Sequence, residues 1–248
     1  MAGGTPAVFL DYDGTLTPIV ERPEDATLPE ETRRAVKELA TRCPVAVVSG
    51  RDLADVRAMV GIDGIFYAGS HGFDIAGPGG RTEQRAIDHL PHLAAAEAEL
   101  RPAIGTIPGA RLERKRFAVC AHVRQVEEAR VGQVEAAVDA VAARHPELRK
   151  TIGKKVFELR PNVEWDKGRA LQWLLEVVGA DGDDIVPLYV GDDLTDEDAF
   201  RTIAEHGIGV VVRGEDDARE TSARYSLADT DEVRRFLDSI PGSPDGTP

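Results

Sequence analysis

Apolar residues form short runs at both ends of the chain, and segments with helical hydrophobic spacing follow these runs. This alternation is typical of a parallel sheet with helices packed on both faces. Strands are expected at residues 8–10, 45–48, 65–68, 185–190 and 208–212, and helices from about residues 29, 52, 83, 168, 195 and 231. The two ends of the chain therefore predict an α/β core built on a doubly wound parallel sheet.

The middle of the chain has a different pattern. It predicts two strands, a helix and two further strands, at residues 112–116, 117–123, 126–141, 151–152 and 156–159. Gly153 and Lys154 would form the hairpin turn between the last two strands. We expect a Rossmann-like core at residues 1–103 and 165–248, with an α+β cap inserted at residues 104–164. The residues up to Thr5 and from Pro241 onward are rich in Gly, Pro and Ser and are expected to be disordered.

The amino-acid composition limits the classes of protein to which the chain can belong. The 248 residues are 42% hydrophobic and 30% charged, which is typical of a soluble globular chain and excludes coiled coil or disorder as its main state. No apolar run approaches the roughly 20 residues of a membrane span, and the first residues lack the pattern of a secretory signal, so we expect a cytoplasmic protein. Cys43 and Cys120 are too few for a disulfide scaffold and are expected to be buried small hydrophobic residues.

Charge is unevenly distributed. The net charge of −14 makes nucleic acid an unfavourable partner. Residues 101–165, however, carry 13 Lys or Arg against 8 Asp or Glu, a net of +5, which leaves −19 for the remainder. The middle of the chain is therefore expected to be a separate unit that faces something anionic.

Two carboxylates follow the first apolar strand. Asp11 and Asp13 are two residues apart in an extended segment, so both side chains should point toward one site. Gly14 then permits a sharp turn and exposes backbone N–H groups to an anion. A pair of solvated loop acids beside a glycine turn is the alternative interpretation of this motif alone.

A second acidic cluster follows the strand at 185–190. Five acids between residues 192 and 198 repel one another unless a positive charge neutralises them, and Mg²⁺ accepts such carboxylate oxygens. Helix capping accounts for Asp196 and Asp198. It does not account for the adjacent pair Asp192 and Asp193 at a strand end, which are the candidate metal ligands together with Asp11 and Asp13.

Ser49, at the end of the second strand, and Lys167 complete a set of groups suited to a phosphoryl group. A hydroxyl, backbone N–H groups and an ammonium can stabilise the equatorial oxygens of phosphorus. A lone serine is usually a helix cap and a lone lysine is usually a surface charge. These groups indicate a phosphoryl site only because all four occur in a fixed order along the chain, three of them at strand ends.

The motifs DYDGT, VSGR, DKG and GDDLTDED, in that order, resemble the haloacid dehalogenase superfamily of aspartate-based phosphatases. GSHG, LERK, HVR, ELRP and WDKG make the chain more closely similar to trehalose-6-phosphate phosphatases, although Val123 stands where that family often has Tyr. The resemblance implies that Asp11 is the nucleophile, that Asp13 is the general acid and base, and that Mg²⁺ is the cofactor. It implies that Mg²⁺ is held by Asp11, the backbone carbonyl of Asp13 and Asp192, with Asp193 and Asp196 orienting ligands or waters around it. It also implies that Ser49 and Lys167 assist.

The resemblance also supplies candidate substrate-binding residues. They are Gly14, Thr15, Gly50, Arg51, His71, Glu113, Lys115, Arg124, Lys154 and Glu158. Glu113 and Lys115 alternate on one predicted strand, so both could reach one ligand. A solvated charged face is the alternative for the cap residues, and a loop histidine bonded to backbone is the alternative for His71.

The function implied is Mg²⁺-dependent hydrolysis of trehalose 6-phosphate through an aspartyl phosphate. The same fold could act on another sugar phosphate, such as sucrose 6-phosphate or a glycosyl-glycerate phosphate. A catalytically inactive regulatory domain and a signalling receiver are alternatives of another class, but a receiver is about half this length and carries no cap. We expect a monomer whose partner is a small sugar phosphate, without nucleic acid or membrane.

Overall fold

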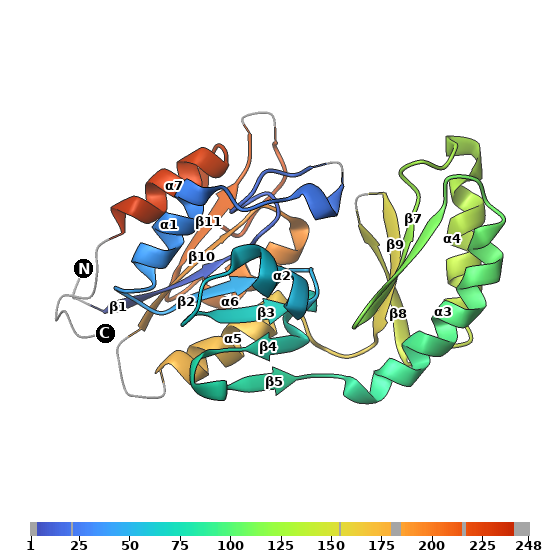
Figure 1. Ribbon diagram of the computed structural model, residues 1–248, viewed down its shortest axis with the longest axis horizontal. Coiled ribbons are helices and arrows are strands. Elements are labelled where there is room, and N and C mark those ends of the chain that lie inside the picture. The colour runs from blue at the N-terminus through green and yellow to red at the C-terminus, as the bar shows by residue number, and fades with distance from the viewer. Residues whose placement is uncertain (1–3, 21, 154, 180–184, 215–216, 241–248) are drawn as a thin grey trace. The chain divides into compact units, whose positions relative to one another are not determined.

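The structure is a computed structural model that describes residues 4–20, 22–153, 155–179, 185–214 and 217–240. It divides into two compact units (Figure 1). The first, called the core unit, comprises residues 1–83 and 165–248, and the second, called the cap unit, comprises residues 84–164.

The core unit contains an eight-stranded sheet in the order β12-β11-β10-β1-β2-β3-β4-β5. Its strands are β1 (Thr5–Leu10), β2 (Val45–Val48), β3 (Phe66–Gly69), β4 (Asp74–Ala76), β5 (Thr82–Gln84), β10 (Ile185–Gly191), β11 (Ile208–Val212) and β12 (Tyr225–Leu227). The six strands from β12 to β3 pair in parallel, and β4 is antiparallel to β3. The predicted α/β class is confirmed.

Helices cover both faces of this sheet. Val8 and Leu10 of β1 face α1 (Glu30–Leu39), α2 (Leu53–Val60) and α7 (Thr230–Ser239), while Ala7 and Phe9 face α5 (Lys167–Val178) and α6 (Glu197–Ile203). Short 3₁₀ turns lie at Pro23–Asp25, Ser70–Gly72, Pro78–Gly80, Ile87–His89 and Leu194–Asp196. Burial of both sheet faces explains why the strands read as continuous apolar runs.

The cap unit is a four-stranded antiparallel sheet in the order β6-β7-β9-β8, with two helices on one face. The strands are β6 (Arg111–Lys115), β7 (Ala118–His122), β8 (Leu148–Gly153) and β9 (Val156–Pro161), and the helices are α3 (Leu90–Gly105) and α4 (Glu128–Ala142). The predicted turn residue Lys154 lies outside the described residues.

Three expectations differ from the structure. The cap unit begins at Gln84 rather than at residue 104, because α3 buries Leu93 and Leu100 in the hydrophobic core of the cap sheet. The helix expected from residue 83 begins at Leu90, where Pro91 occupies its first turn, since residues 82–84 form strand β5. Thr5, expected to be disordered, is the first residue of β1.

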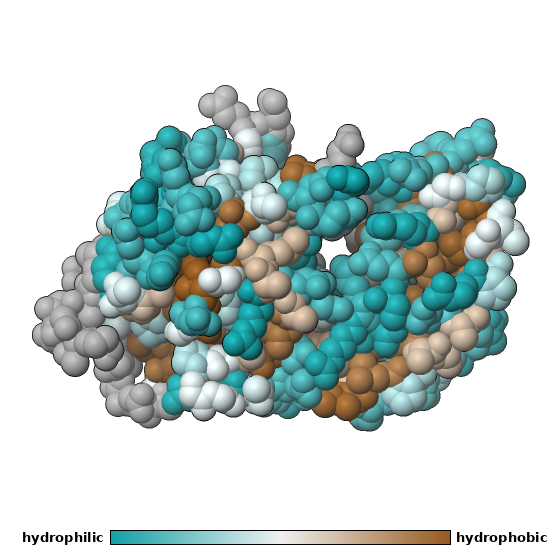
Figure 2. Space-filling model, in the orientation of Figure 1, coloured by the Kyte–Doolittle hydropathy of each residue, from teal (hydrophilic) through white to brown (hydrophobic). Residues whose placement is uncertain are grey.

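The surface in view is mostly hydrophilic, with smaller apolar patches between the charged residues (Figure 2). Among the described helices, none combines the length and the apolar character that crossing a bilayer requires.

Candidate active site

Three predicted residues meet at the carboxyl ends of neighbouring strands. Asp11 follows β1, Ser49 follows β2 and Asp192 follows β10, and these strands are adjacent in the sheet. The chain proceeds from β1 to β3 on one side and from β10 to β12 on the other, so β1 and β10 form the topological switch point. Parallel α/β sheets bind ligands in the crevice that opens there.

Gly14 brings the first and last of these loops into contact. Its φ of +85° is in the left-handed region, and a Cβ atom at this position would lie 2.1 Å from Oδ2 of Asp192. Only a residue without a side chain allows the Asp192 carboxylate to pack there. Gly14 thus has a packing role in the structure, in addition to the substrate-binding role expected for it.

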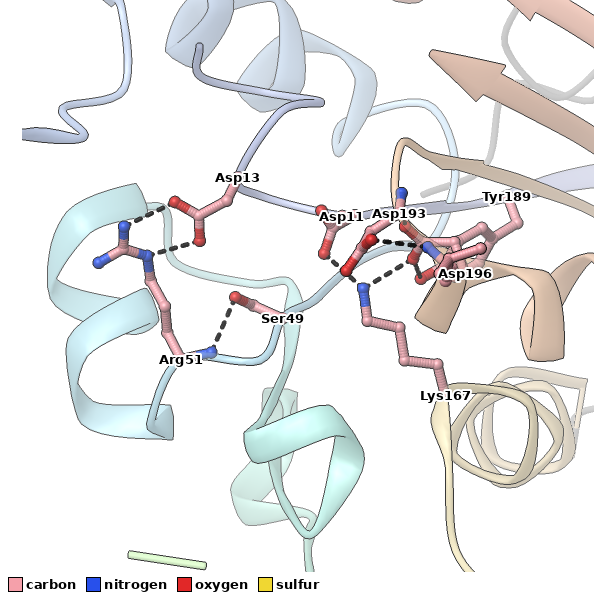
Figure 3. Close-up of polar contacts among 9 residues, drawn as sticks. Asp11, Asp13, Ser49, Arg51, Lys167, Tyr189, Asp193 and Asp196 are labelled. Carbon is pink, nitrogen blue, oxygen red and sulfur yellow. Dashed lines mark hydrogen bonds and ion pairs between the residues drawn. The ribbon is translucent and has the colours of Figure 1, made fainter. Parts of the chain in front are cut away.

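Lys167 forms the centre of a buried charge cluster (Figure 3). From the first residue of α5, its Nζ donates to Oδ1 of Asp11 and to Oδ1 of Asp196, each at 2.7 Å. Asp196 also accepts the Tyr189 hydroxyl at 2.7 Å and the backbone N–H of Asp193 at 2.9 Å. The Lys167 side chain is 3% exposed, so this lysine is an internal counter-ion rather than a surface charge.

Burial and charge shift the titration of these groups. Burial raises the pKa of Asp11 well above its ordinary value, although Lys167 opposes the shift. Burial, with the negative charge of Asp196, raises the pKa of Asp192 to about 7. Burial lowers the pKa of Lys167, but the two carboxylates beside it outweigh this effect and raise it. The single lysine therefore compensates only part of the negative charge that these acids can carry.

The acids fit a divalent cation. Among the described residues, one carboxylate oxygen from each of Asp11, Asp192 and Asp196 lies within 4.8 Å of the others. Oδ1 of Asp192 is buried and has no hydrogen-bond partner in the described part of the chain. Because a buried carboxylate oxygen needs a partner, this orphaned atom favours a hard cation at the site.

Asp193, an expected metal ligand, is not part of this group. Its exposed side chain accepts the backbone N–H of Leu194 at 2.7 Å and caps the 3₁₀ turn, with Asp196 completing a capping box. The third member of the group is Asp196, which was expected to cap the turn and to orient metal ligands or waters. In the structure Asp196 caps this turn and also binds Lys167.

Asp13 is paired with Arg51. The guanidinium donates from Nε to Oδ2 of Asp13 at 2.7 Å and from the terminal nitrogen to Oδ1 at 2.6 Å, and it lies over the Tyr12 ring. The backbone N–H of Arg51 donates to Oγ of the buried Ser49 at 3.1 Å. Asp13, expected to transfer protons, and Arg51, expected to bind the phosphate or the sugar, are thus held together as one ion pair (Figure 3).

Three other expected residues border this pair. A Cβ atom at Gly50 would lie 2.7 Å from the ring of His71, whose backbone N–H donates to the carbonyl of Ser49 at 2.8 Å. Thr15 is fully buried, and its hydroxyl has no hydrogen-bond partner among the described residues. Gly50, His71 and Thr15 therefore lie within the same loop cluster as Ser49 and Asp13.

The expected sugar-binding residues of the cap unit share one sheet face. Glu113 pairs with Cys120, and Cys120 pairs with Glu158, so Glu113 and Glu158 point to the same side, as does Lys115. This side is opposite the one that packs on α3 and α4. Arg124 follows β7 and is exposed, outside this strand face.

Both glutamates on this face are ionised by their neighbours. A 2.6 Å hydrogen bond with Nε2 of His122 lowers the pKa of Glu113. Burial opposes ionisation of Glu158, but Arg160 and Lys115 lower the pKa of its carboxyl overall. The face therefore presents fixed negative acceptors and positive donors, a combination suited to sugar hydroxyls.

Comparison with known proteins identifies the family. A family model described as trehalose-phosphatase matches residues 9–231. The chain belongs to the trehalose-phosphatase family. It is 48% identical over 239 residues to the trehalose-phosphate phosphatase of Mycobacterium tuberculosis H37Rv, covering 95% of this chain and 61% of that protein. The corresponding protein of Mycobacterium avium is 46% identical over 247 residues, covering 97% and 63%.

A solved structure supports the assignment. The crystal structure of a trehalose-6-phosphate phosphatase related protein superposes with a TM-score of 0.80 at 25% identity, covering 93% of this chain and 95% of that one. This chain spans about 61% of the length of the mycobacterial relative from strain H37Rv.

Two site residues of this trehalose-phosphatase family member, Tyr189 and Arg219, were not identified from the sequence. Tyr189 lies inside an apolar strand, where nothing distinguished it from a core residue. Arg219, which donates to the backbone carbonyl of Asp192, lies in a segment without a pattern. Asp196 was visible within the acidic cluster, but only the three-dimensional structure shows Lys167 beside it.

Proposed function

We propose that the chain hydrolyses trehalose 6-phosphate to trehalose and inorganic phosphate through an aspartyl phosphate on Asp11. The observation that carries the proposal is the buried Asp11–Lys167 pair at the switch point of a trehalose-phosphatase family member. Lys167 holds Oδ1 of Asp11, and the other carboxylate oxygen attacks phosphorus in line. The P–O bond to the sugar breaks, and its electron pair leaves with the sugar oxygen.

Asp13 is the general acid and base in this proposal. Asp13 first takes up a proton from solvent and donates it to the departing sugar oxygen. The resulting carboxylate then removes a proton from the water that attacks the phosphoryl group and releases Asp11. The Arg51–Asp13 ion pair must open for this to occur. A substrate phosphate offers Arg51 a second bidentate anionic partner, so phosphate binding would release Asp13 for proton transfer.

We assign Mg²⁺ as the cation, held by Asp11 and Asp192. Its positive charge would allow the anionic substrate to approach a site lined with carboxylates. Ser49 and Lys167 supply the hydroxyl and ammonium donors for the phosphoryl oxygens. The hydroxyl of Thr15, buried without a partner among the described residues, is suited to a phosphoryl oxygen as well.

The cap unit would select the sugar. Glu113, Lys115 and Glu158 on one sheet face, with Arg124 and Lys154, are the residues assigned to its hydroxyls. A compact sugar phosphate as the only partner, a monomeric state and a cytoplasmic location complete the proposal. The last is supported by the two cysteines, both of which are buried free thiols.

A panel of sugar phosphates tests the substrate. Phosphate release is measured with trehalose 6-phosphate, sucrose 6-phosphate and a glycosyl-glycerate phosphate, each with Mg²⁺ and after chelation. We expect kcat/KM to favour trehalose 6-phosphate by more than about tenfold and activity to require the cation. A preference below tenfold would reassign the substrate, and failure of all three would support a regulatory domain.

Asp11→Asn tests the nucleophile. We expect kcat to fall by about ten-thousandfold or more, because the neutral amide cannot form the acyl phosphate. Asp198→Asn, in the same acidic stretch but paired with Arg201 at the surface, is the matched control and should retain activity. Comparable activity in the two variants would remove Asp11 from the mechanism.

A further inference from the structure

Two histidines and a glutamate gather on the cap unit, apart from the phosphatase site of the core unit. His92 lies in the first turn of α3, and His145 and Glu147 lie between α4 and β8. One ligand atom from each lies within 4.8 Å of the other two. In sequence these residues have no metal-ligand spacing, because 53 positions separate His92 from His145.

Backbone hydrogen bonds fix the loop that carries two of these residues. The N–H of His145 donates to the carbonyl of Ala142 at 3.1 Å, and the N–H of Leu148 donates to that of His145 at 2.9 Å. Asn162, which directly follows β9, anchors the loop by donating its backbone N–H to the Glu147 carbonyl at 2.7 Å and its side-chain amide to the Pro146 carbonyl. The donors are therefore largely positioned before any ligand binds.

An outer carboxylate orients one of the imidazoles. Nε2 of His145 lies 3.0 Å from Oε1 of Glu99, and Arg144 donates to the other oxygen of Glu99 at 2.8 Å. Such a carboxylate fixes the tautomer of a ligating histidine and leaves its second nitrogen, Nδ1, for a metal.

We propose that His92, His145 and Glu147 form a second metal site, specific for a divalent transition ion of the Zn²⁺ type. Two imidazoles and one carboxylate suit Zn²⁺, which takes three protein ligands and a water, whereas Mg²⁺ prefers oxygen ligands. Glu99 and Glu147 outnumber Arg144, so the local charge favours a dication. His145 is 13% exposed, while His92 and Glu147 are about 40% exposed, which leaves one side open for entry.

A bound ion would link two segments of the cap unit. It would join the start of α3 to the loop before β8, which are distant in sequence and both bordered by the cap core. The site would therefore stabilise the fold rather than take part in phosphate chemistry. It is independent of the proposed function, because none of its residues is among those assigned to the phosphate chemistry or to the sugar.

Zn²⁺ binding to the full chain tests the site. The chain is stripped of metal, supplied with excess Mg²⁺ and titrated with Zn²⁺ by calorimetry. We expect one Zn²⁺ site whose affinity falls by more than about tenfold in His92→Ala and His145→Ala, and by about tenfold in Glu99→Gln. His206→Ala, an exposed histidine of the core unit, is the matched control and should leave the affinity unchanged.

Two further measurements keep the outcome decisive. Asp192→Asn removes an acid of the core site and should leave Zn²⁺ binding intact, whereas loss of binding in this variant would place the ion in the core and overturn the proposal. Co²⁺ should give the visible absorption of a low-coordinate nitrogen site in the wild-type chain and lose it in Glu147→Gln, a surface variant expected to fold. Equal Zn²⁺ affinity in the wild type and both histidine variants would also overturn it.

Discussion

At the residue scale, the core site depends on one lysine and one glycine that act through contact. Lys167 donates to both Asp11 and Asp196 and offsets part of their negative charge, and Gly14 leaves room for the Asp192 carboxylate beside the first loop. Both residues therefore determine where the carboxylates of the site are placed.

Gly14→Ala tests this packing role. A Cβ atom would overlap the Asp192 carboxylate, so we expect kcat to fall by roughly a hundredfold or more and the cation affinity to weaken. Gly64→Ala is the matched control, since Gly64 has a similar φ of +83° but no described atom within 4 Å of a Cβ atom. It should cost about 1–2 kcal/mol of stability and leave kcat unchanged. Equal activity losses in the two variants would attribute the effect to backbone strain alone.

Residues that directly follow apolar strands could be predicted from the sequence. Asp11, Ser49 and Asp192 were identified because the carboxyl ends of parallel strands meet at one edge. Tyr189 could not be identified, and the contact of Asp196 with Lys167 could not be foreseen, because both depend on burial rather than on a local pattern. The Arg51–Asp13 pair was also unforeseen, since 38 positions separate a residue expected to bind the substrate from one expected to transfer protons.

At the element scale, the packing of α5 against α6 sets the position of Lys167. Gly168, the second residue of α5, lies against the start of α6, and a Cβ atom there would be 2.6 Å from both the carbonyl oxygen of Asp198 and the hydroxyl of Thr202. The glycine of the DKG motif is thus explained by helix packing. Its neighbour Lys167 is positioned by the same contact.

Gly168→Ala should separate these helices. We expect a loss of about 1–3 kcal/mol of stability and a lower kcat, because α5 and Lys167 must shift. Gly132→Ala in α4 is the matched control: no described atom lies within 4 Å of its Cβ position, so it should stabilise the chain by about 0.5–1 kcal/mol. Urea unfolding and phosphate release measure both effects, and a stabilised Gly168→Ala would refute the packing argument.

The cap sheet gives a pH prediction. Glu158 has a folded-state pKa below its ordinary value of 4.5, because Arg160 and Lys115 outweigh its burial. Its contribution to stability is therefore present above about pH 4.5 and is lost as the pH falls through the lower folded pKa. In urea unfolding, Glu158→Gln should flatten this acid-side decline, whereas Glu128→Gln, an exposed acid of α4, should not. Parallel pH curves for the wild type and Glu158→Gln would contradict the assignment.

Elements with a strong hydrophobic period were predicted well, and weakly patterned ones were not. The strands at 45–48 and 208–212 have the predicted bounds because both of their faces are buried. Strand β5 consists of Thr82, Glu83 and Gln84, which have no apolar face, so only pairing with β4 reveals it. The unit to which α3 belongs is likewise decided by the partners of its side chains, not by its own sequence.

At the scale of the whole molecule, the two units have separate hydrophobic cores. Asp11, Asp192 and Asp196, called the acid group, lie entirely in the core unit. The sugar-binding candidates of the cap sheet lie entirely in the cap unit. Ligand effects on stability should therefore be local. A ligand protects the segments that its own contacts stabilise.

Hydrogen exchange of the full chain tests this independence. Adding Mg²⁺ should slow amide exchange in segments around residues 8–15 and 188–200, and leave the cap segments 111–122 and 148–161 unchanged within error. The reason is that every carboxylate of the acid group belongs to the core unit. Asp192→Asn should abolish the Mg²⁺ effect, and equal protection of both units would show that they are energetically coupled.

The Lys167 ammonium has a consequence for how the protein is made. Because a residue of the chain itself offsets part of the charge of Asp11 and Asp196, we expect the nascent polypeptide to fold before any inorganic ion binds. The raised pKa of Asp192 favours the same order of events, since a protonated carboxyl adds no further negative charge to the site. A cell starved of the cation would then accumulate a folded protein that still lacks its ion.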